Sequence, residues 1–431
     1  VDWVNSWTWN PFVPPPQFLL PRMLISKIKF MEKLNRSRID ISGAAYLTSR
    51  MTVCREKHHA APSRRYRGPI STRRLVQASL KSREEGLEKV AVGWRRMHRA
   101  LFLLDLLKRE PEQVIRVSSL ERYRGKLDLW EQPDISSVIR RWPRVFELYK
   151  DCKGSLWCGM TEELEALVRE EVTLLEAHSD WAAEVVTRLL MMAAEKRIPL
   201  HKLGGLQRDI GLPHDFRRSW LPRYPQLFRV AAGDCLELAS WNPHWAVTKL
   251  EKATPGVLDG AAATDTPPQR LFLRFPVKIP YLRRRRMQRL ARARVRRFHR
   301  TAYLSPYAEA RVQPRGEVRK RAVGVVHELL SLTLEKRAWY SGLTGVRREL
   351  GLPQKVMRFL MRHGGVFYVS YKGNKECVFL REGYRGSRLV EKPPLVRWRE
   401  KFSKLMRCRR DESRSSLSEV MGDQNAGDTY L

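Results

Sequence analysis

The chain of 431 residues repeats one pattern of apolar and polar positions three times. In each copy, a Leu-rich stretch and a short amphipathic stretch lead to a segment whose apolar residues recur at i, i+3, i+4 and i+7, the spacing of an α-helix. A Pro or Gly then ends the helix, and the residues that follow alternate with the period of two of a β-strand. Each copy is therefore predicted to be three helices and a β-hairpin, which is the order of a winged helix.

The junction between the last helix and the hairpin is the most regular part of the repeat. Its clearest copy is Arg223-Tyr224-Pro225-Gln226-Leu227-Phe228-Arg229-Val230, and weaker copies occupy residues 141–148 and 362–369. Each copy combines a basic residue, a ring, a helix breaker, an aliphatic residue and a Phe. We expect Tyr224, Phe228 and their counterparts to be core residues that close each copy, in preference to ligand contacts.

The same pattern gives the individual elements. The Leu-rich stretches are at 101–107, 185–192 and 323–332, and the short helices after them end near 127–129, 211–213 and 351–353. The apolar faces predicted for the third helices are Ile135, Val138, Ile139 and Trp142; then Phe216, Trp220 and Tyr224; then Val356, Phe359, Leu360 and His363. The predicted hairpins join 145–149 to 156–160, 227–230 to 235–238, and 367–371 to 376–380. An acidic helix at 162–177 is expected to be solvated or to face a basic part of the protein, and a last helix spans 395–406.

The predicted fold class is α+β and predominantly helical, with tandem winged-helix-like modules and a basic linker. The expected division of the chain is 1–85, a transit peptide or disordered basic arm; 86–172, module one; 173–255, module two; 256–316, a linker and arginine-rich segment; 317–390, module three; 391–410, a C-terminal helix; and 411–431, a disordered tail.

The charge of the chain indicates its kind of partner. Lys and Arg number 82 against 46 Asp and Glu, which gives a formal net charge of +36. Such an excess implies a polyanion, and nucleic acid is the commonest one. A membrane surface is also anionic, but no basic amphipathic helix with a bulky apolar face stands free of a module, so no membrane partner is expected. No apolar run approaches the ~18 residues of a membrane span.

The N-terminal region has the composition of a targeting sequence. Between Ile41 and Ser82 there are nine Lys and Arg and a single acid, Glu56, in a background rich in Ser and Ala. Acid-poor, Arg- and Ser-rich composition near an N-terminus is typical of organelle transit peptides. A basic disordered arm is the alternative. The six cysteines form no Cys-x-x-Cys pair and no zinc-finger spacing, which fits reduced thiols.

The most basic segment lies between Tyr281 and Arg300, which holds ten arginines and no acid. Met287, Leu290, Ala291 and Val295 are interspersed, so we expect a helix with a thin apolar stripe. Like charges at i and i+4 repel each other within an isolated helix, and a polyanion would relieve that repulsion. The alternative is a solvated, mobile connector.

The candidate RNA-binding residues are this arginine run and the basic residues that face outward from the third helices and the third hairpin. In a winged helix these elements can contact a nucleic-acid groove or backbone, and guanidinium groups pair bidentately with phosphate. The run contributes Arg283, Arg284, Arg285, Arg286, Arg289, Arg292, Arg294, Arg296, Arg297 and Arg300. The third helices contribute Arg140, Arg144, Arg217, Arg218, Arg223, Lys355, Arg358 and Arg362, and the hairpin contributes Lys372 and Lys375.

No catalytic constellation is evident. The chain has no Gly-x-Gly-x-x-Gly, no phosphate-binding loop ending in Gly-Lys-Ser/Thr, and no His-Glu-x-x-His. His327 lies on a Leu-rich helix, where we expect a core or capping histidine. The chain is therefore predicted not to be an enzyme, and to need no metal, cofactor or small-molecule substrate.

Several motifs carry a resemblance to a known family. They are Gly211-Leu212-Pro213-His214-Asp215-Phe216, residues 223–228, Ser240-Trp241-Asn242-Pro243, Ser305-Pro306-Tyr307, and the stretches at 327–337, 367–373 and 378–384. Over about residues 85 to 406 the chain resembles the plant organelle RNA recognition (PORR) family. His363-Gly364-Gly365 departs from the usual Pro-containing form, and the arginine run is more basic than is typical there.

The resemblance implies a nuclear-encoded plant protein that binds RNA and promotes the splicing of organellar group II introns, with other splicing factors as further candidate partners. It implies import into an organelle, with the mitochondrion as the predicted destination and the chloroplast stroma as the alternative. Structured and single-stranded RNA should matter more than duplex sequence, because A-form RNA hides its major groove. The competing hypotheses are a winged-helix regulator that binds DNA and a basic component of an organellar ribosome.

Overall fold

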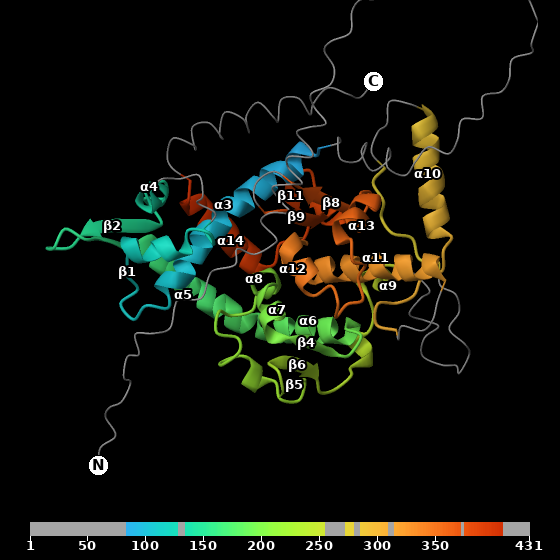
Figure 1. Cartoon of the computed structure of the whole chain (residues 1–431), viewed down its shortest axis with the longest axis horizontal. Coiled ribbons are helices and arrows are strands. Elements are labelled where there is room, and N and C mark those ends of the chain that lie inside the picture. The colour runs from blue at the N-terminus through green and yellow to red at the C-terminus, as the bar shows by residue number, and fades with distance from the viewer. Residues whose placement is uncertain are drawn as a thin grey trace, which may run out of the picture. The chain divides into compact units, whose positions relative to one another are not determined.

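The computed structural model describes residues 83–127, 134–254, 272–279, 285–308, 314–371 and 375–407. Helices predominate in these residues and the strands form small antiparallel sheets (Figure 1), so the predicted α+β class is confirmed. None of the helices in these ranges is long and apolar enough to cross a membrane. The predicted arm up to residue 82, the linker at 255–271 and the tail from residue 408 lie outside the described residues, as do Arg283, Arg284 and Lys372.

Three three-stranded sheets have the same strand order, in which the last strand lies between the other two. The first sheet has β1 (Ile115–Arg116), β2 (Phe146–Lys150) and β3 (Leu156–Met160). The second has β4 (Arg197–Pro199), β5 (Phe228–Ala231) and β6 (Cys235–Leu238), and the third has β7 (Arg337–Trp339), β8 (Phe367–Ser370) and β9 (Cys377–Leu380). The predicted hairpins β2–β3, β5–β6 and β8–β9 are confirmed. The first strand of each sheet, at two or three residues, is too short to show an alternating pattern and was not predicted.

The helices agree with the predicted elements in most places. They are α3 (Glu85–Leu107), α4 (Ile135–Ile139), α5 (Glu162–Ala177), α6 (Ser179–Met192), α7 (Leu200–Gly204), α8 (Gln207–Ile210), α9 (Lys249–Lys252), α10 (Arg285–His299), α11 (Arg315–Leu332), α12 (Tyr340–Gly345), α13 (Val356–Arg362) and α14 (Pro394–Leu405). Short 3₁₀ helices are η1 (Val117–Tyr123), η2 (Leu221–Arg223), η3 (Pro243–Trp245) and η4 (Arg381–Gly383), and β10 (Tyr384–Arg385) pairs with β11 (Arg388–Leu389).

One predicted helix is wrong. The stretch that carries Phe216 and Trp220 forms a series of turns followed by η2, with no α-helix. Its backbone hydrogen bonds do not keep the four-residue spacing of an α-helix. Arg218 N–H donates to Asp215 O, and Leu221 N–H donates to Phe216 O. Pro213 and Pro222 flank the stretch, and a proline donates no backbone hydrogen bond. The apolar spacing survives nonetheless, since Phe216 and Trp220 are both buried.

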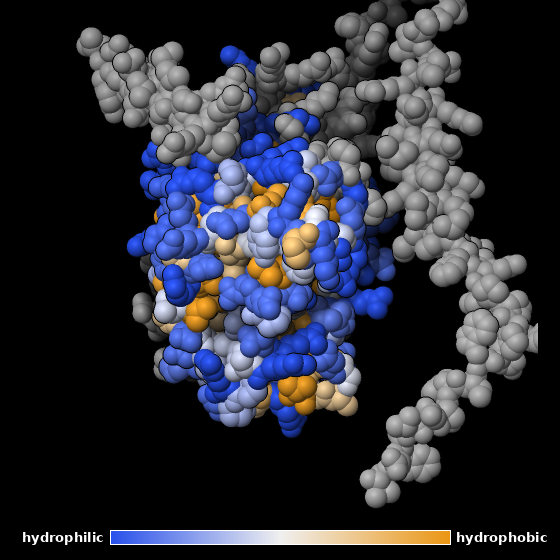
Figure 2. Space-filling model, turned by 90° about the vertical axis from the view of Figure 1, so that its left-hand side faces the viewer, coloured by the Kyte–Doolittle hydropathy of each residue, from blue (hydrophilic) through white to orange (hydrophobic). Residues whose placement is uncertain are grey.

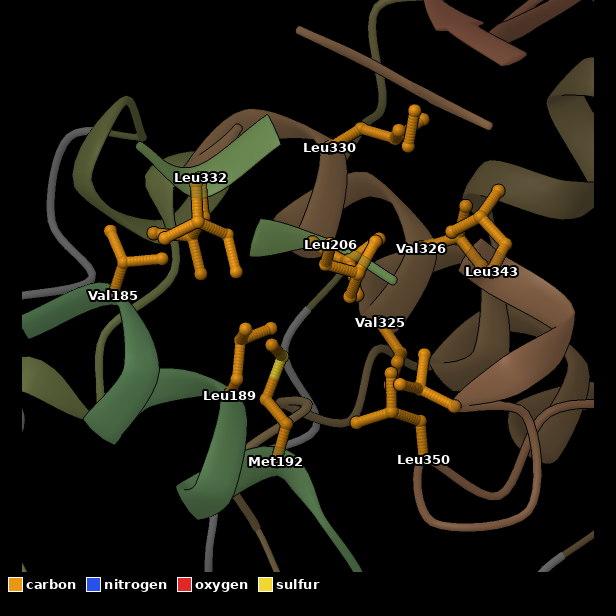
Figure 3. Close-up of a cluster of buried hydrophobic side chains, with 14 of the residues drawn as sticks. Val185, Leu189, Met192, Leu206, Val325, Val326, Leu330, Leu332, Leu343 and Leu350 are labelled. Atoms are coloured by element: carbon orange, nitrogen blue, oxygen red, sulfur yellow. The ribbon is translucent and has the colours of Figure 1, made fainter. Parts of the chain in front are cut away.

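Helices α6 and α11 form the centre of one core. Figure 3 shows Val185, Leu189 and Met192 of α6 in one cluster of buried side chains with Val325 and Leu330 of α11. All five side chains are almost fully buried. Since full burial of such a side chain contributes about 1.5–3 kcal/mol, this contact ties the second sheet's part of the chain firmly to the third's.

The third sheet is buried on both faces. On one face Val378 and Phe367 belong to the core around α6 and α11. On the other face Phe379 and Tyr368 belong to a second core, which contains α3 and the first sheet. Trp339 stacks on Trp94 of α3, with ring centroids 4.0 Å apart. The predicted repeats therefore share their cores and do not pack as separate units.

The acidic helix α5 meets a basic one, as the sequence led us to expect. Lys401 of α14 lies 2.6 Å from Glu170, and the Trp398 indole donates to Leu167 O at 2.7 Å. Glu163 near the start of α5 pairs with Arg144 at 3.1 Å. The acids of α5 thus neutralise cations of this protein.

Candidate nucleic-acid interface

Helix α10 is an arginine-covered helix with no buried residue. Its apolar stripe consists of Met287, Ala291, Val295 and Phe298, which are each half-buried and lie at helical spacing. Leu290, which the sequence assigned to the stripe, is instead exposed. The predicted contacts Arg285, Arg286, Arg289, Arg292, Arg294, Arg296, Arg297 and Arg300 are all exposed.

The last turn of α10 anchors it to the rest of the protein. The Phe298 ring lies 5.6 Å from Phe275 and 5.2 Å from His363, the residue that follows α13. Lys320 of α11 donates to Thr301 O at 2.6 Å and to His299 O at 3.2 Å. In Figure 1, α10 meets the N-terminal end of α11 and its earlier turns extend away from that helix. The ends of three helices thus converge around Phe298.

Four arginines surround this convergence, and we call them the arginine cluster: Arg294 of α10, Arg319 of α11, and Arg358 and Arg362 of α13. All four are exposed. Partial burial, and then the charges of Arg358, Arg319 and Arg294, lower the pKa of Arg362. Burial first, and then Arg319, Arg362 and Arg294, lower the pKa of His363 to about 4. Both pKa shifts reflect the positive charge that α10, α11 and α13 bring close to Arg362 and His363.

The arginine cluster has no acidic partner in the described parts of the chain, where none of its members forms an ion pair. Unneutralised like charges held close together repel, and such an arrangement attracts a multiply charged anion. Planar guanidinium groups suit phosphate, because each can donate two parallel hydrogen bonds. The cluster can therefore bind a phosphate backbone.

Sequence reasoning found three members of the cluster and missed Arg319. This residue lies on the helix that was assigned to the core, 25 positions from Arg294 (319 − 294). The basic run Arg319-Lys320-Arg321 at the start of an otherwise apolar helix was the available signal.

The remaining predicted residues occupy different surroundings. Arg144 pairs with Glu163 at 3.1 Å and Arg217 pairs with Asp234 at 3.0 Å, in both cases at the surface. Exposed pairs of this kind contribute about 0–1 kcal/mol, so phosphate can displace them. Arg140, Arg218, Arg223 and Lys355 are exposed.

Lys375 is half-buried and faces the first sheet's part of the chain. Its Nζ lies 5.9 Å from the Trp339 ring centroid, and its carbonyl oxygen accepts from Arg95 Nε at 3.1 Å.

The face of the molecule shown in Figure 2 is mainly hydrophilic, and its apolar residues form small separate patches.

A pocket of about 230 Å³ also carries ionisable groups. In it Glu391 lies 2.7 Å from Lys249, and Glu382 lies 2.9 Å from His327. His327 is almost fully buried, as expected of a core histidine. The described residues contain no group of three or more His, Cys, Asp or Glu side chains that could hold a metal ion.

Comparison with known proteins identifies relatives of the chain. It is 35% identical over 352 residues to Protein WHAT'S THIS FACTOR 1, chloroplastic, of Zea mays, covering 80% of this chain and 70% of the relative. It is 36% identical to the homologue of that protein in Oryza sativa, covering 81% and 70% of the two chains. Protein WHAT'S THIS FACTOR 9, mitochondrial, of Arabidopsis thaliana is 27% identical, with 71% and 78% covered. No solved structure matches the chain.

A family model, described as the plant organelle RNA recognition domain, matches residues 82–411. The match spans every element of the structure, from α3 to α14. It confirms the resemblance found in the sequence motifs, and with it the role of an RNA-binding factor in the splicing of organellar group II introns. The chain belongs to the plant organelle RNA recognition family.

Proposed function

We propose that the chain promotes group II intron splicing by holding intron RNA against α10 and the arginine cluster, while the folded intron supplies the catalytic groups. The observation that carries this proposal is the arginine cluster itself. Four exposed arginines from three helices lie together without an acidic partner among the described residues. A chain of phosphates fits this arrangement better than a single anion does, because α10 continues the positive surface for several turns beyond the cluster.

The three repeats are proposed to be winged-helix-like modules at residues 86–172, 173–255 and 317–390. The shared strand order of their sheets supports this interpretation. In this arrangement α13 is the third helix of module three, and its exposed face carries Arg358 and Arg362. The remaining predicted contacts, from Arg140 to Lys375, are proposed to extend the surface at lower affinity, since two of them, Arg144 and Arg217, are paired with acids.

The bound RNA is proposed to be structured or single-stranded intron RNA. The deep, narrow major groove of an A-form duplex excludes side chains, so a protein surface contacts its backbone or unpaired bases. The site of action is an organelle. The sequence prediction favoured the mitochondrion, whereas the relatives at 35% and 36% identity are chloroplastic by name and the mitochondrial one is at 27%. Imaging of a fluorescent fusion in plant cells distinguishes the two.

Filter binding with purified full-length chain tests the proposal. The test variant changes Arg294, Arg319, Arg358 and Arg362 to Gln. The control variant changes Arg169, Arg385, Arg388 and Arg397, which are equally exposed and lie outside the predicted set. We expect the test variant to bind a group II intron transcript roughly tenfold or more weakly, and its salt slope to fall by roughly 0.7–0.9 for each lost phosphate contact.

The control variant should retain wild-type affinity, because the proposal attributes RNA binding to the position of the arginine cluster and not to the net charge of the chain. Equal losses in both variants would mean that the arginine cluster has no special role. Tighter binding of duplex DNA than of intron RNA would favour the DNA-binding hypothesis. Crosslinking and sequencing of the retained RNA from both organelles would then identify the intron, and co-purification after nuclease treatment would identify any protein partners.

A further inference from the structure

The motif Ser240-Trp241-Asn242-Pro243 contains one residue that the fold does not explain. Ser240 Oγ donates to Gln226 O at 2.9 Å, which closes the hairpin. Asn242 Oδ1 accepts from His244 N at 3.0 Å, and Pro243 begins η3. Trp241, by contrast, is 45% exposed. An indole is the largest apolar side chain, and leaving it in water forgoes its contribution to stability. Its place in the motif therefore requires another reason.

A cation is fixed beside this ring. Lys196 Nζ lies 4.9 Å from the Trp241 ring centroid, within the range of a cation–π interaction. The same Nζ donates to Met191 O at 2.6 Å, near the end of α6. Lys196 immediately precedes β4 and has a φ of 55°. The ammonium group is thus held in place by a helix end and a rigid turn, next to an exposed ring.

The third sheet shows the same corner in a closed form. Leu238 N donates to Lys196 O in the second sheet, and Leu380 N donates to Lys336 O in the third. Three residues after these leucines stand Trp241 and Gly383 respectively. A Cβ on Gly383 would lie 2.7 Å from the Cβ of Lys336, so there the backbone itself packs on the lysine. In the second sheet that position carries an exposed indole.

The outer face of the second sheet carries two arginines, each paired with a glutamate. The strand register aligns Arg197, Glu237 and Arg229 in one row on this face. Arg229 pairs with Glu237 at 3.1 Å and Arg197 pairs with Glu195, all near the surface. The third sheet's equivalent row is buried against the first sheet's part of the chain. The second sheet leaves its row open, and exposed ion pairs exchange for phosphate at little cost.

Other exposed aromatic side chains lack these features. Burial, and then charges that include Glu112 and Asp151, raise the pKa of Tyr149. The Tyr371 hydroxyl donates to the Met357 sulfur at 3.2 Å. Among the exposed aromatic residues that the structure describes, Trp241 is the one with a cation over its ring. Tyr149 is 44% exposed, close to the 45% of Trp241, so it makes a matched control.

We propose that Trp241 is a stacking platform for an unpaired RNA base, with Lys196, Arg197 and Arg229 contacting the adjacent phosphates. Every base has a π face, so such a platform accepts single strands of varied sequence. The inference rests on the proposed RNA-binding function and assigns single-stranded elements of the intron to the second sheet. The arginine cluster would then hold backbone, and Trp241 would hold a base that has left the helical stack.

The test measures binding of the full-length chain to an oligouridylate of roughly 12 nucleotides, a length typical of single-strand sites. We expect Trp241→Ala to lower the affinity about five- to a hundredfold, the range of one lost base stack. Trp241→Phe should recover most of it, because a smaller ring still stacks. The salt slope should stay unchanged in both, since stacking releases no counterions. Tyr149→Ala should bind like the wild type, and thermal melting checks that all variants fold.

The outcomes separate this inference from the proposed function. Wild-type chain that binds neither oligouridylate nor intron RNA would overturn both. If the arginine-cluster variant loses intron RNA while Trp241→Ala keeps full affinity for oligouridylate, the stacking platform is wrong and the proposed function stands. That second outcome would leave the exposed indole as a surface for a protein partner. Loss on Trp241→Ala without recovery by Phe, or with a reduced salt slope, would also contradict stacking.

Discussion

Helices α10 and α11 follow each other in the chain and differ in nearly every physical respect. Twelve residues of α11 are buried, including a run from Ala322 to Leu332 with no exposed position, whereas α10 has none. α11 is stabilised by the apolar side chains that pack around it. α10 carries like charges at i and i+4, such as Arg292 and Arg296, which destabilise an isolated helix. One helix thus serves the core, and the other carries like charges that a bound polyanion would neutralise.

The largest expected effect that tests this comparison comes from a buried charge on α11. Glu328 is fully buried and accepts from Arg188 at 2.5 Å, from the Tyr307 hydroxyl at 3.0 Å and from Lys249 N at 2.9 Å. Glu328→Ala should lower the free energy of unfolding by about 3–5 kcal/mol, because the buried Arg188 guanidinium loses its buried partner and keeps only the more exposed Glu184. Urea denaturation measures the change. Glu328→Gln, which keeps the shape, should lose less, and a loss below about 1 kcal/mol for the Ala variant would contradict the assignment.

A matched pair of leucines makes the comparison direct. Leu330 of α11 is fully buried, and Leu290 of α10 is 38% exposed. Leu330→Ala should lower the free energy of unfolding by about 2–5 kcal/mol through lost burial and a cavity. Leu290→Ala should change it by no more than about 0.5 kcal/mol. Comparable losses at the two positions would mean that α10 is buried against something in the intact protein.

Substitution in α10 should separate stability from binding. Arg292→Gln with Arg296→Gln removes an i, i+4 repulsion, so the free energy of unfolding should stay constant or rise by roughly 0.2–0.5 kcal/mol. The affinity for intron RNA should fall, and the salt slope should fall by up to about 1.4–1.8 if both contact phosphate. Melting curves and binding isotherms on the same preparations test the expected direction of both changes, in stability and in RNA affinity. A variant that is less stable yet binds RNA normally would identify α10 as structural.

A pH dependence is expected where α10 meets α13. Burial, reinforced by Arg319, Arg362 and Arg294, holds the pKa of His363 at about 4 in the folded chain, below the value of ~6.5 for an unfolded histidine. The unfolded state therefore binds more protons between these values, and stability falls as the pH drops from about 6.5 toward 4. His363→Phe keeps a ring against Phe298 and should flatten this part of the pH profile. Parallel profiles for the two proteins would show that His363 does not titrate differently on folding.

Local patterns in the sequence predicted the local structure well. The hairpins and the Leu-rich helices follow from periodicity, because each element buries one face or all of its faces. The helix expected at Phe216 and Trp220 is wrong, since two prolines override the apolar spacing. The short first strands β1, β4 and β7 gain their partners only when distant hairpins fold against them, so no local signal marks them.

The candidate site was predictable in its chemistry and only partly in its composition. The charge of the arginine run and of α13 is visible in the sequence. The two groups of arginines come together only in the tertiary structure, where Phe298 contacts His363, 65 positions further along the chain. For the same reason Arg319 was overlooked, and the acids that pair with Arg144 and Arg217 were unforeseen.

The third sheet, enclosed on both faces by the remainder of the fold, has a consequence for how such proteins diversify. RNA-binding proteins built as strings of independent repeats can gain or lose a copy and so lengthen or shorten the sequence they recognise. Here, removing one repeat would expose a face of the third sheet. Losing a repeat would therefore destabilise the fold. A lineage that needs a new intron target must change exposed side chains, such as those of α10 and of the second sheet, on a scaffold that stays constant.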